Sequence, residues 1–214
     1  MERPVALTPL QVEVAQIFFG LRASKGFLVA GGAALLASEL IVRPTEDLDL
    51  FASSPIASVV EAKLALTGAL EDRAYQVVVV QDSPTFCRIV VRGAEQEILV
   101  DLGVDSPPLG SPTMTVLGPT LAPLELASRK LLALFGRAEA RDFADVALLV
   151  RRFGKEELLK GAASLDGGFD SSVLAQMMRT LDRFTDDEIP LDGAGVRQAR
   201  EFFSDWADSL QHRA

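Results

Sequence analysis

The sequence is poor in the residues that build disulfides and zinc sites. It has one cysteine, Cys87, and one histidine, His212, in 214 residues. One cysteine cannot form an internal disulfide, and a zinc site draws several ligands from cysteine and histidine. Cys87 lies in a predicted strand with no histidine nearby, so we expect it to fill the core rather than to act as a nucleophile.

A long apolar run is also absent. The longest candidate, residues 27–36, contains Gly31 and Gly32 and is too short to span a bilayer. Residues 1–4 lack the basic region and the apolar stretch of a signal peptide. We therefore expect a cytoplasmic protein that has no membrane partner.

The sequence also has fewer basic residues than acidic ones. The net charge is −9, whereas nucleic-acid binding usually depends on a basic surface. Residues 129–152 are an exception, because six basic residues stand there against three acidic ones. This stretch is compatible with a local basic surface and with an ordinary solvated helix face.

Hydrophobic periodicity divides the chain into a mixed half and a helical half. In the first half we expect helices over residues 9–22, 33–41 and 56–70, and strands over 27–30, 47–52, 75–80, 85–92, 97–102 and 113–117. In the second half we expect helices over residues 123–135, 139–152, 155–163, 171–184 and 195–210. The expected fold class is α/β (α+β), with a small mixed β-sheet core over residues 1–118 and a C-terminal helical subdomain over residues 119–214.

The segment from Asp47 to Leu50 alternates acidic and apolar residues on a predicted strand. Residues i and i+2 of a strand face the same way, so Asp47 and Asp49 share one face while Leu48 and Leu50 point into the core. Two neighbouring carboxylates repel each other unless a cation lies between them, and Mg²⁺ is commonly held by a few carboxylates. The alternative is that both aspartates occupy an exposed turn, which the flanking apolar residues disfavour.

Two further features accompany this pair. Gly31 and Gly32 stand at a predicted strand-to-helix turn, where backbone can approach a phosphate closely, although such glycines often serve packing alone. Asp101 ends an apolar predicted strand and can complete a metal site or act as a general base, with Asp105 as a competing candidate. A simple turn-capping role for Asp101 is the alternative.

A lysine on an apolar helix face is the last candidate. Lys130 lies between Leu126 and Leu134 on a predicted helix, and Asp142 and Asp145 share one face of the next. Two roles are open for Lys130: a buried ion pair with Asp142, or contact with the phosphates of a nucleotide.

Taken in order, these residues resemble the AbiEii/AbiGii toxin family of nucleotidyltransferases, within the polymerase-β-like superfamily. The resemblance covers about residues 26–150. It consists of the apolar strand into Gly31-Gly32, Arg43-x-Thr45-x-Asp47-Leu48-Asp49, Asp101, Lys130-Leu131-x-Ala133-Leu134, Arg137 and Arg141-Asp142-Phe143-x-Asp145. One departure is Ala33, where the family often has a hydroxyl residue, which implies weaker phosphate binding if that hydroxyl contributes.

The resemblance implies a role for each matching residue. Asp47 and Asp49 would hold a divalent metal, Mg²⁺ or Mn²⁺, and Asp101 would be the third carboxylate. Gly31 and Gly32 would cradle the triphosphate of an NTP substrate. The remaining matches would contact phosphate (Lys130), support the site or its base (Asp142) and shape the entry to the catalytic strand (Arg43 and Thr45).

The resemblance also implies an activity: transfer of a nucleoside monophosphate from an NTP to an acceptor hydroxyl. Relatives are typically paired with an antitoxin, and some modify the 3′ end of tRNA, so we expect a cognate antitoxin and a tRNA acceptor. One alternative is an aminoglycoside-type enzyme, since cationic substrates suit an acidic surface. The other is a non-catalytic nucleotide-binding or protein-interaction module, which the set of carboxylates disfavours.

Overall fold

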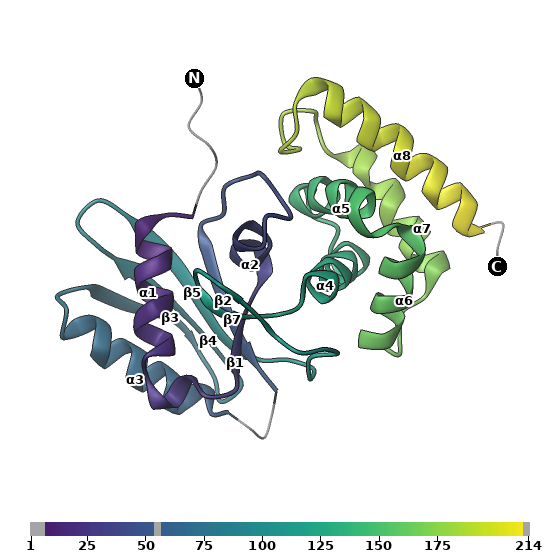
Figure 1. Ribbon diagram of the computed structural model, residues 1–214. Helices are drawn as coiled ribbons and strands as arrows, with labels where there is room; N and C mark the ends of the chain where they lie inside the picture. The colour runs from purple at the N-terminus through teal and green to yellow at the C-terminus, as the bar shows by residue number, and fades with distance from the viewer. Residues whose placement is uncertain (1–6, 54–56, 212–214) are drawn as a thin grey trace. The chain divides into compact units, whose positions relative to one another are not determined.

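The computed structural model describes residues 7–53 and 57–211. His212 and the predicted helix start at Ile56 lie outside these ranges. The chain divides into two compact units, Met1–Pro123 and Leu124–Ala214, which are described separately below (Figure 1). The expected fold class is confirmed: a mixed sheet with helices is followed by helices alone.

Within the described residues, seven strands form one mixed sheet in the order β3-β4-β5-β2-β1-β7-β6. Strand β2 lies at the centre, parallel to β5 and antiparallel to β1. Strands β3, β4 and β5 follow one another as an antiparallel meander. The strands are β1 (Phe27–Ala30), β2 (Asp47–Ala52), β3 (Gln76–Asp82), β4 (Phe86–Arg92), β5 (Glu97–Val104), β6 (Thr113–Thr115) and β7 (Gly118–Thr120).

One face of the sheet is covered by helices α1 (Pro9–Phe19) and α3 (Val59–Glu71), which contact the sheet and each other (Figure 1). Alternate residues of β2 and β5 point to this face, among them Leu48, Leu50 and Leu102, and all three are fully buried. Cys87 of β4 is also fully buried, as expected of a core residue. The other face of the same strands therefore carries Asp47, Asp49 and Asp101.

Helix α2 (Gly31–Ala37) starts and ends earlier than its sequence pattern predicts. It begins directly after β1, because Gly31 takes a left-handed backbone conformation with φ +64° and turns the chain from strand into helix. It ends because Glu39 also takes a left-handed conformation, with φ 57°. The amide of Leu40 then donates to the carbonyl of Leu35 and closes the helix end.

In the described part of the second unit, every regular element is a helix. Its core gathers large side chains from several helices, including Phe143, Phe203 and Trp206, each at most 1% exposed. The predicted helix over 171–184 is interrupted, since α7 ends at Arg179 and a 3₁₀ turn follows over Thr180–Arg183. The helices are α4 (Pro123–Gly136), α5 (Ala140–Phe153), α6 (Lys155–Leu165), α7 (Ser171–Arg179) and α8 (Gly193–Gln211).

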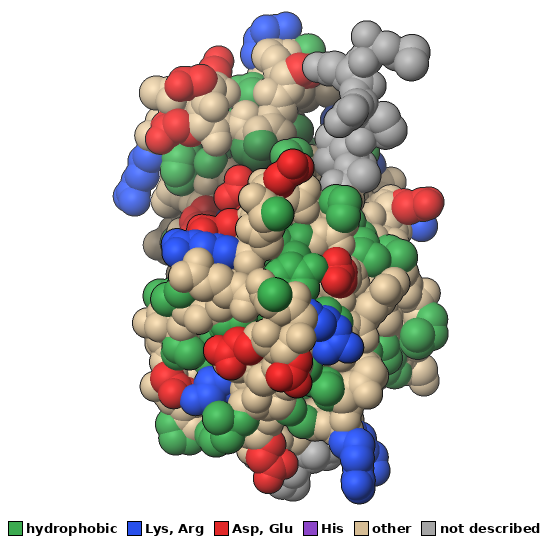
Figure 2. All heavy atoms as spheres, turned by 90° about the vertical axis from the view of Figure 1, so that its left-hand side faces the viewer, with side chains coloured by type: hydrophobic (Ala, Val, Ile, Leu, Met, Phe, Trp, Pro, Cys, Tyr) green, Lys and Arg blue, Asp and Glu red, His purple; other side chains and the backbone are tan. Residues whose placement is uncertain are grey.

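The charged side chains of the surface are of both signs. On the face drawn in Figure 2, Lys and Arg side chains alternate with Asp and Glu side chains and with hydrophobic ones. Charges are therefore mixed on this face, despite the net charge of −9. Among the helices of the described residues, none combines the length and the apolarity that crossing a bilayer requires.

Candidate active site

The centre of the site is Asp49 on β2. In the sheet register its Cα lies opposite Ala30 of β1 on one side and opposite Asp101 of β5 on the other. Asp47 lies two residues earlier on the same face. The predicted alternation is confirmed, since Leu48 and Leu50 are fully buried while both aspartates are partly exposed. Three carboxylates therefore occupy one face of two adjacent strands.

The carboxylate of Asp49 lies directly against the backbone of Gly31. A Cβ atom at Gly31 would lie 1.6 Å from Asp49 Oδ2 and 2.6 Å from its Cγ. No side chain fits there, and the φ of +64° at Gly31 independently favours glycine. The glycine turn and the acidic strand thus form one local structure.

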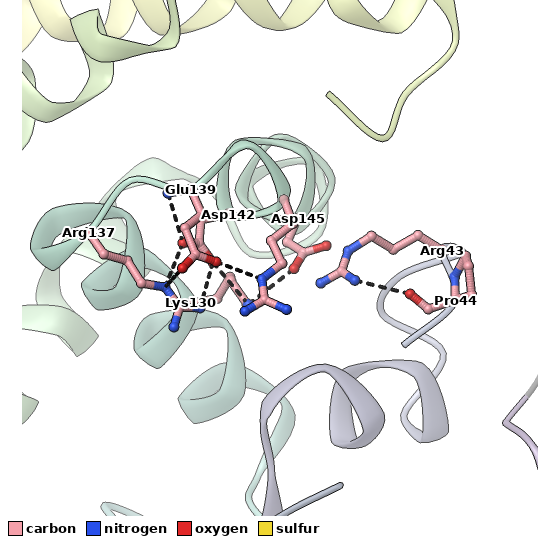
Figure 3. A network of polar contacts seen from close by, with 8 residues as sticks. Arg43, Pro44, Lys130, Arg137, Glu139, Asp142 and Asp145 are labelled. Atoms are coloured by element: carbon pink, nitrogen blue, oxygen red, sulfur yellow. Dashed lines mark hydrogen bonds and ion pairs between the residues drawn. The ribbon is translucent and has the colours of Figure 1, made fainter. Parts of the chain in front are cut away.

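Gly32 makes a similar close approach to the segment that leads into β2. A Cβ atom at Gly32 would lie 2.8 Å from Thr45 Oγ1 and 3.8 Å from Arg43 Nη2. Thr45 is buried, and Arg43 Nη1 donates to the carbonyl of Pro44 at 3.1 Å (Figure 3). The four residues that the sequence assigns to nucleotide binding in this unit, Gly31, Gly32, Arg43 and Thr45, therefore lie around one turn.

Gln11 is a positioning residue that the sequence analysis missed. Its side chain is fully buried, and Nε2 donates to the carbonyl of Thr45 at 2.9 Å and to that of Asp47 at 3.2 Å. Its Oε1 accepts from the amide of Thr8 and completes the capping box of α1. One side chain thus ties the start of α1 to the segment that enters β2. The available signal was the pattern Thr8-x-x-Gln11 at the start of the predicted helix, which is typical of a capping box.

Arg88 on β4 is the second residue that was missed. Its Cα lies opposite Asp101, and its guanidinium donates from Nε to Asp101 Oδ1 at 2.8 Å and from Nη2 to Oδ2 at 2.6 Å. These hydrogen bonds raise the pKa of Arg88, burial opposes them, and the negative charges of Asp101, Asp47 and Asp49 add to the increase. Arg88 is therefore electrostatically coupled to all three carboxylates.

The donor set on this face fits a divalent cation better than it fits zinc. Asp47, Asp49 and Asp101 offer oxygen ligands, which Mg²⁺ and Mn²⁺ prefer. Within the described residues, however, no three acidic, histidine or cysteine side chains converge into a ready-made metal site. Asp101 is directed to Arg88 instead. Asp105, the competing candidate, is exposed beyond the end of β5 and accepts from the amide of Ser106.

The second unit contains the other predicted site residues, in a buried charge network between α4 and α5 (Figure 3). Lys130 Nζ lies 3.2 Å from Asp142 Oδ1 and 3.2 Å from Asp145 Oδ2. Arg137 Nε lies 3.0 Å from Asp142 Oδ2, which also accepts from the amide of Glu139. The predicted ion pair between Lys130 and Asp142 is present. It accounts for the buried lysine charge, so contact between Lys130 and a phosphate stays a prediction.

Asp142 is held in its charged form within this network. Burial raises its pKa, but hydrogen bonds from Arg137 and the positive charge of Lys130 outweigh burial, so the pKa lies below its ordinary value of 3.8. Both Asp142 and Asp145 are fully buried. The network therefore stabilises the pairing of α4 with α5 while Asp142 stays ionised.

Comparison with known proteins places the chain in a family. Residues 21–213 match the family described as nucleotidyl transferase AbiEii toxin, type IV TA system. Among curated proteins, no sequence gives a significant match.

Two solved structures share the fold. JHP933 from Helicobacter pylori has 17% sequence identity and a TM-score of 0.59, and the match covers 97% of this chain and 96% of that chain. A second H. pylori structure, described as a candidate nucleotidyltransferase, has 16% identity and a TM-score of 0.59, covering 97% of this chain and 99% of that chain. Since the family match extends over residues 21–213, the chain belongs to the AbiEii family of nucleotidyltransferase toxins.

Proposed function

We propose that the protein transfers a nucleoside monophosphate from an NTP to an acceptor hydroxyl. The acceptor oxygen bonds to the α-phosphorus, the bond between that phosphorus and the β-phosphate oxygen breaks, and pyrophosphate leaves. The hydroxyl proton passes to a carboxylate, for which Asp101 is the candidate. The observation that carries the proposal is the position of Asp49, between the Gly31 turn on one side and Asp101 on the other.

Asp47 and Asp49 are the residues proposed to hold a divalent cation, Mg²⁺ or Mn²⁺, with Asp101 as the third carboxylate. The support is their common face on β2 and β5 and the oxygen chemistry of the set. Such a cation, when bound, orients the triphosphate and neutralises charge on the transferring phosphoryl group.

The turn beside these carboxylates is proposed to bind the triphosphate. Gly31 lets the carboxylate of Asp49 lie against the backbone of the turn, and Thr45 and Arg43 flank the turn beside Gly32. Arg43 supplies a positive charge there. In the second unit, a phosphate contact for Lys130 and a supporting role for Asp142 rest on the family resemblance alone.

The proposed acceptor is the 3′ end of a tRNA, and the proposed biological role is that of a toxin with a cognate antitoxin. Membership in the AbiEii toxin family supports the toxin role. Because NTPs and tRNA are the proposed substrates, the proposal places the reaction in the cytoplasm.

A cationic small molecule is the second candidate acceptor. The net charge of −9 favours it, because an acidic surface attracts aminoglycosides and repels RNA. Both acceptors require the same nucleotidyl transfer chemistry, so the choice between them leaves the roles of Asp47 and Asp49 unchanged.

The test is label transfer from each α-labelled NTP, with Mg²⁺ or Mn²⁺, to total tRNA or to a panel of aminoglycosides. We expect transfer by the wild type to one acceptor class and its loss in Asp49→Asn. The matched control is Asp72→Asn, at the exposed end of α3, which should retain wild-type activity. Absence of transfer with every NTP and acceptor would contradict the enzymatic proposal and favour a binding module.

The toxin role is tested separately in cells. Expression of the wild-type chain should slow growth, and the Asp49→Asn variant at equal abundance should not. Equal growth of both strains, alongside transfer activity in vitro, would contradict the toxin role and leave the enzymatic proposal standing.

A further inference from the structure

The ion pair between Arg88 and Asp101 has a consequence for cation binding at the proposed site. The guanidinium of Arg88 engages both oxygens of Asp101, at 2.8 Å and 2.6 Å. Fork-to-fork pairing of this kind is the strongest geometry available to an arginine and a carboxylate. The third carboxylate of the face, which would be available to a divalent cation, is therefore already bound to a positively charged side chain.

The position of Arg88 also allows its guanidinium to move away from Asp101. Its side chain is 42% exposed, whereas the side chain of Asp101 is 9% exposed. The guanidinium can therefore swing towards solvent while Asp101 stays fixed on β5 between Asp49 and Arg88. An arginine that moves away exposes Asp101 beside the other two carboxylates of the face.

A divalent cation and the guanidinium cannot share Asp101 without cost. Both are positively charged, and like charges at short range repel strongly where water is partly excluded. In sites with two metals the ions lie about 3.5–4 Å apart. Carboxylates close to both ions offset the repulsion between their charges. Asp101 is the carboxylate that would complete such a second position, whereas Asp47 and Asp49 lie on the neighbouring strand β2.

We propose that Arg88 competes with a second divalent cation for Asp101 and thereby sets how tightly the site binds that cation. This inference rests on the proposed function, since it assumes a first cation at Asp47 and Asp49. In the cation-free protein Arg88 holds Asp101, and binding of the second cation requires Arg88 to release it. Arg88 is thus a positioning residue that acts through Asp101.

The size of the effect follows from the fraction of time for which Asp101 is available. If Arg88 holds Asp101 for about nine-tenths of the time, the apparent affinity for the second cation falls about tenfold. Removing the guanidinium then raises that affinity about tenfold, while the first cation, at Asp47 and Asp49, responds much less.

The experiment titrates Mn²⁺ into the full chain and follows binding by electron paramagnetic resonance of the free ion, without NTP. We expect a tighter and a weaker class of site in the wild type. Arg88→Gln should tighten the weaker class about tenfold, and Asp101→Asn should remove it. Arg88→Lys keeps the positive charge but cannot make the paired hydrogen bonds of a guanidinium, so it should give an intermediate affinity.

Arg92→Gln is the matched control, because Arg92 lies on the same strand and face and pairs with Glu97 instead. It should leave both classes unchanged. An unchanged or weakened second class in both Arg88→Gln and Arg88→Lys, with folding verified by circular dichroism, would overturn the inference. If the proposed function itself is wrong, the result is different: neither the wild type nor Asp49→Asn would bind Mn²⁺.

Discussion

At the scale of single residues, local patterns were readable from the sequence and non-local partners were not. The alternation of Asp47, Leu48 and Asp49 needs only the two-residue period of a strand, and the structure has it. The partner of Asp101 is Arg88, thirteen residues away on another strand. Finding it requires the pairing register of β4 with β5, which the sequence pattern does not contain.

The close approach of Gly31 to Asp49 predicts that a side chain at position 31 destabilises the protein. Gly31→Ala places a methyl group 1.6 Å from Asp49 Oδ2 and forces a side chain into a left-handed conformation. The backbone conformation alone costs about 1–2 kcal/mol. We expect a loss of more than about 2 kcal/mol in the free energy of unfolding, measured by urea denaturation, together with loss of nucleotidyl transfer.

Gly68→Ala is the matched control for this variant. Gly68 lies inside α3, and a Cβ atom there meets nothing within 4 Å. In a helix interior alanine is favoured over glycine by about 0.5–1 kcal/mol, so this change should stabilise the protein slightly. If both variants had similar stability and activity, the close packing of Gly31 against Asp49 would be refuted.

At the scale of elements, the bounds of strands were easier to predict than the ends of helices. Strand β2 has the predicted bounds, and polar and apolar residues alternate over its first four positions. Helix α2 was predicted to run to residue 41 and ends at Ala37. Its end depends on a left-handed conformation at Glu39, whereas sequence rules look for glycine at such positions.

Gln11 shows how elements far apart in the chain are joined by one polar side chain. Its amide nitrogen donates to carbonyls 34 and 36 residues away, at the entrance to β2. The sequence pattern predicted that a helix starts at residue 9, but the second role of Gln11 depends on where α1 lies in the fold. Local rules therefore predicted the helix start and missed its contribution to the candidate site.

The network between α4 and α5 makes stability depend on pH in a defined direction. The pKa of Asp142 is lowered in the folded protein, so its ionisation contributes stability above the ordinary value of 3.8. That contribution is lost as pH falls from 3.8 towards the lower folded pKa. In urea denaturation, Asp142→Asn should therefore be clearly less stable than the wild type at neutral pH, and the gap should shrink below about pH 4.

Glu157→Gln, on an exposed position of α6, is the control for this pH dependence. It should change the free energy of unfolding by less than about 0.5 kcal/mol at every pH. A gap between the wild type and Asp142→Asn that stayed constant or widened as pH fell would contradict a lowered pKa for Asp142 in the folded protein.

At the scale of the whole molecule, hydrophobic periodicity predicted the fold class but not the order of the strands. A mixed half followed by a helical half was visible in the periodicity, and the structure has both. The order β3-β4-β5-β2-β1-β7-β6 places the parallel neighbours β2 and β5 side by side across an intervening helix and two strands. Such long-range pairing depends on the packing of the whole sheet, which no local window contains.

The basic stretch over residues 129–152 is largely neutralised by ion pairs. At least four of its six basic residues lie in ion pairs within the second unit, namely Arg129, Lys130, Arg137 and Arg141. Their partners include Glu125, which lies just outside the stretch and was not counted in its charge balance. Most of the apparent excess of positive charge is thus offset by carboxylates of the same unit.

This charge balance predicts how the affinity for a tRNA acceptor depends on salt concentration. Because most lysines and arginines of this stretch are ion-paired, they displace few counterions from phosphates, so the affinity should fall only shallowly with salt. In a plot of log affinity against log salt concentration between about 50 and 200 mM, we expect a slope shallower than about −2, measured by the anisotropy of labelled tRNA. The variant Arg151→Gln should flatten the slope further, because Arg151, in the last turn of α5, donates to the neutral side chain of Gln198 and so keeps its positive charge. A slope steeper than about −4, unchanged in that variant, would mean that RNA is held by a basic surface elsewhere on the chain.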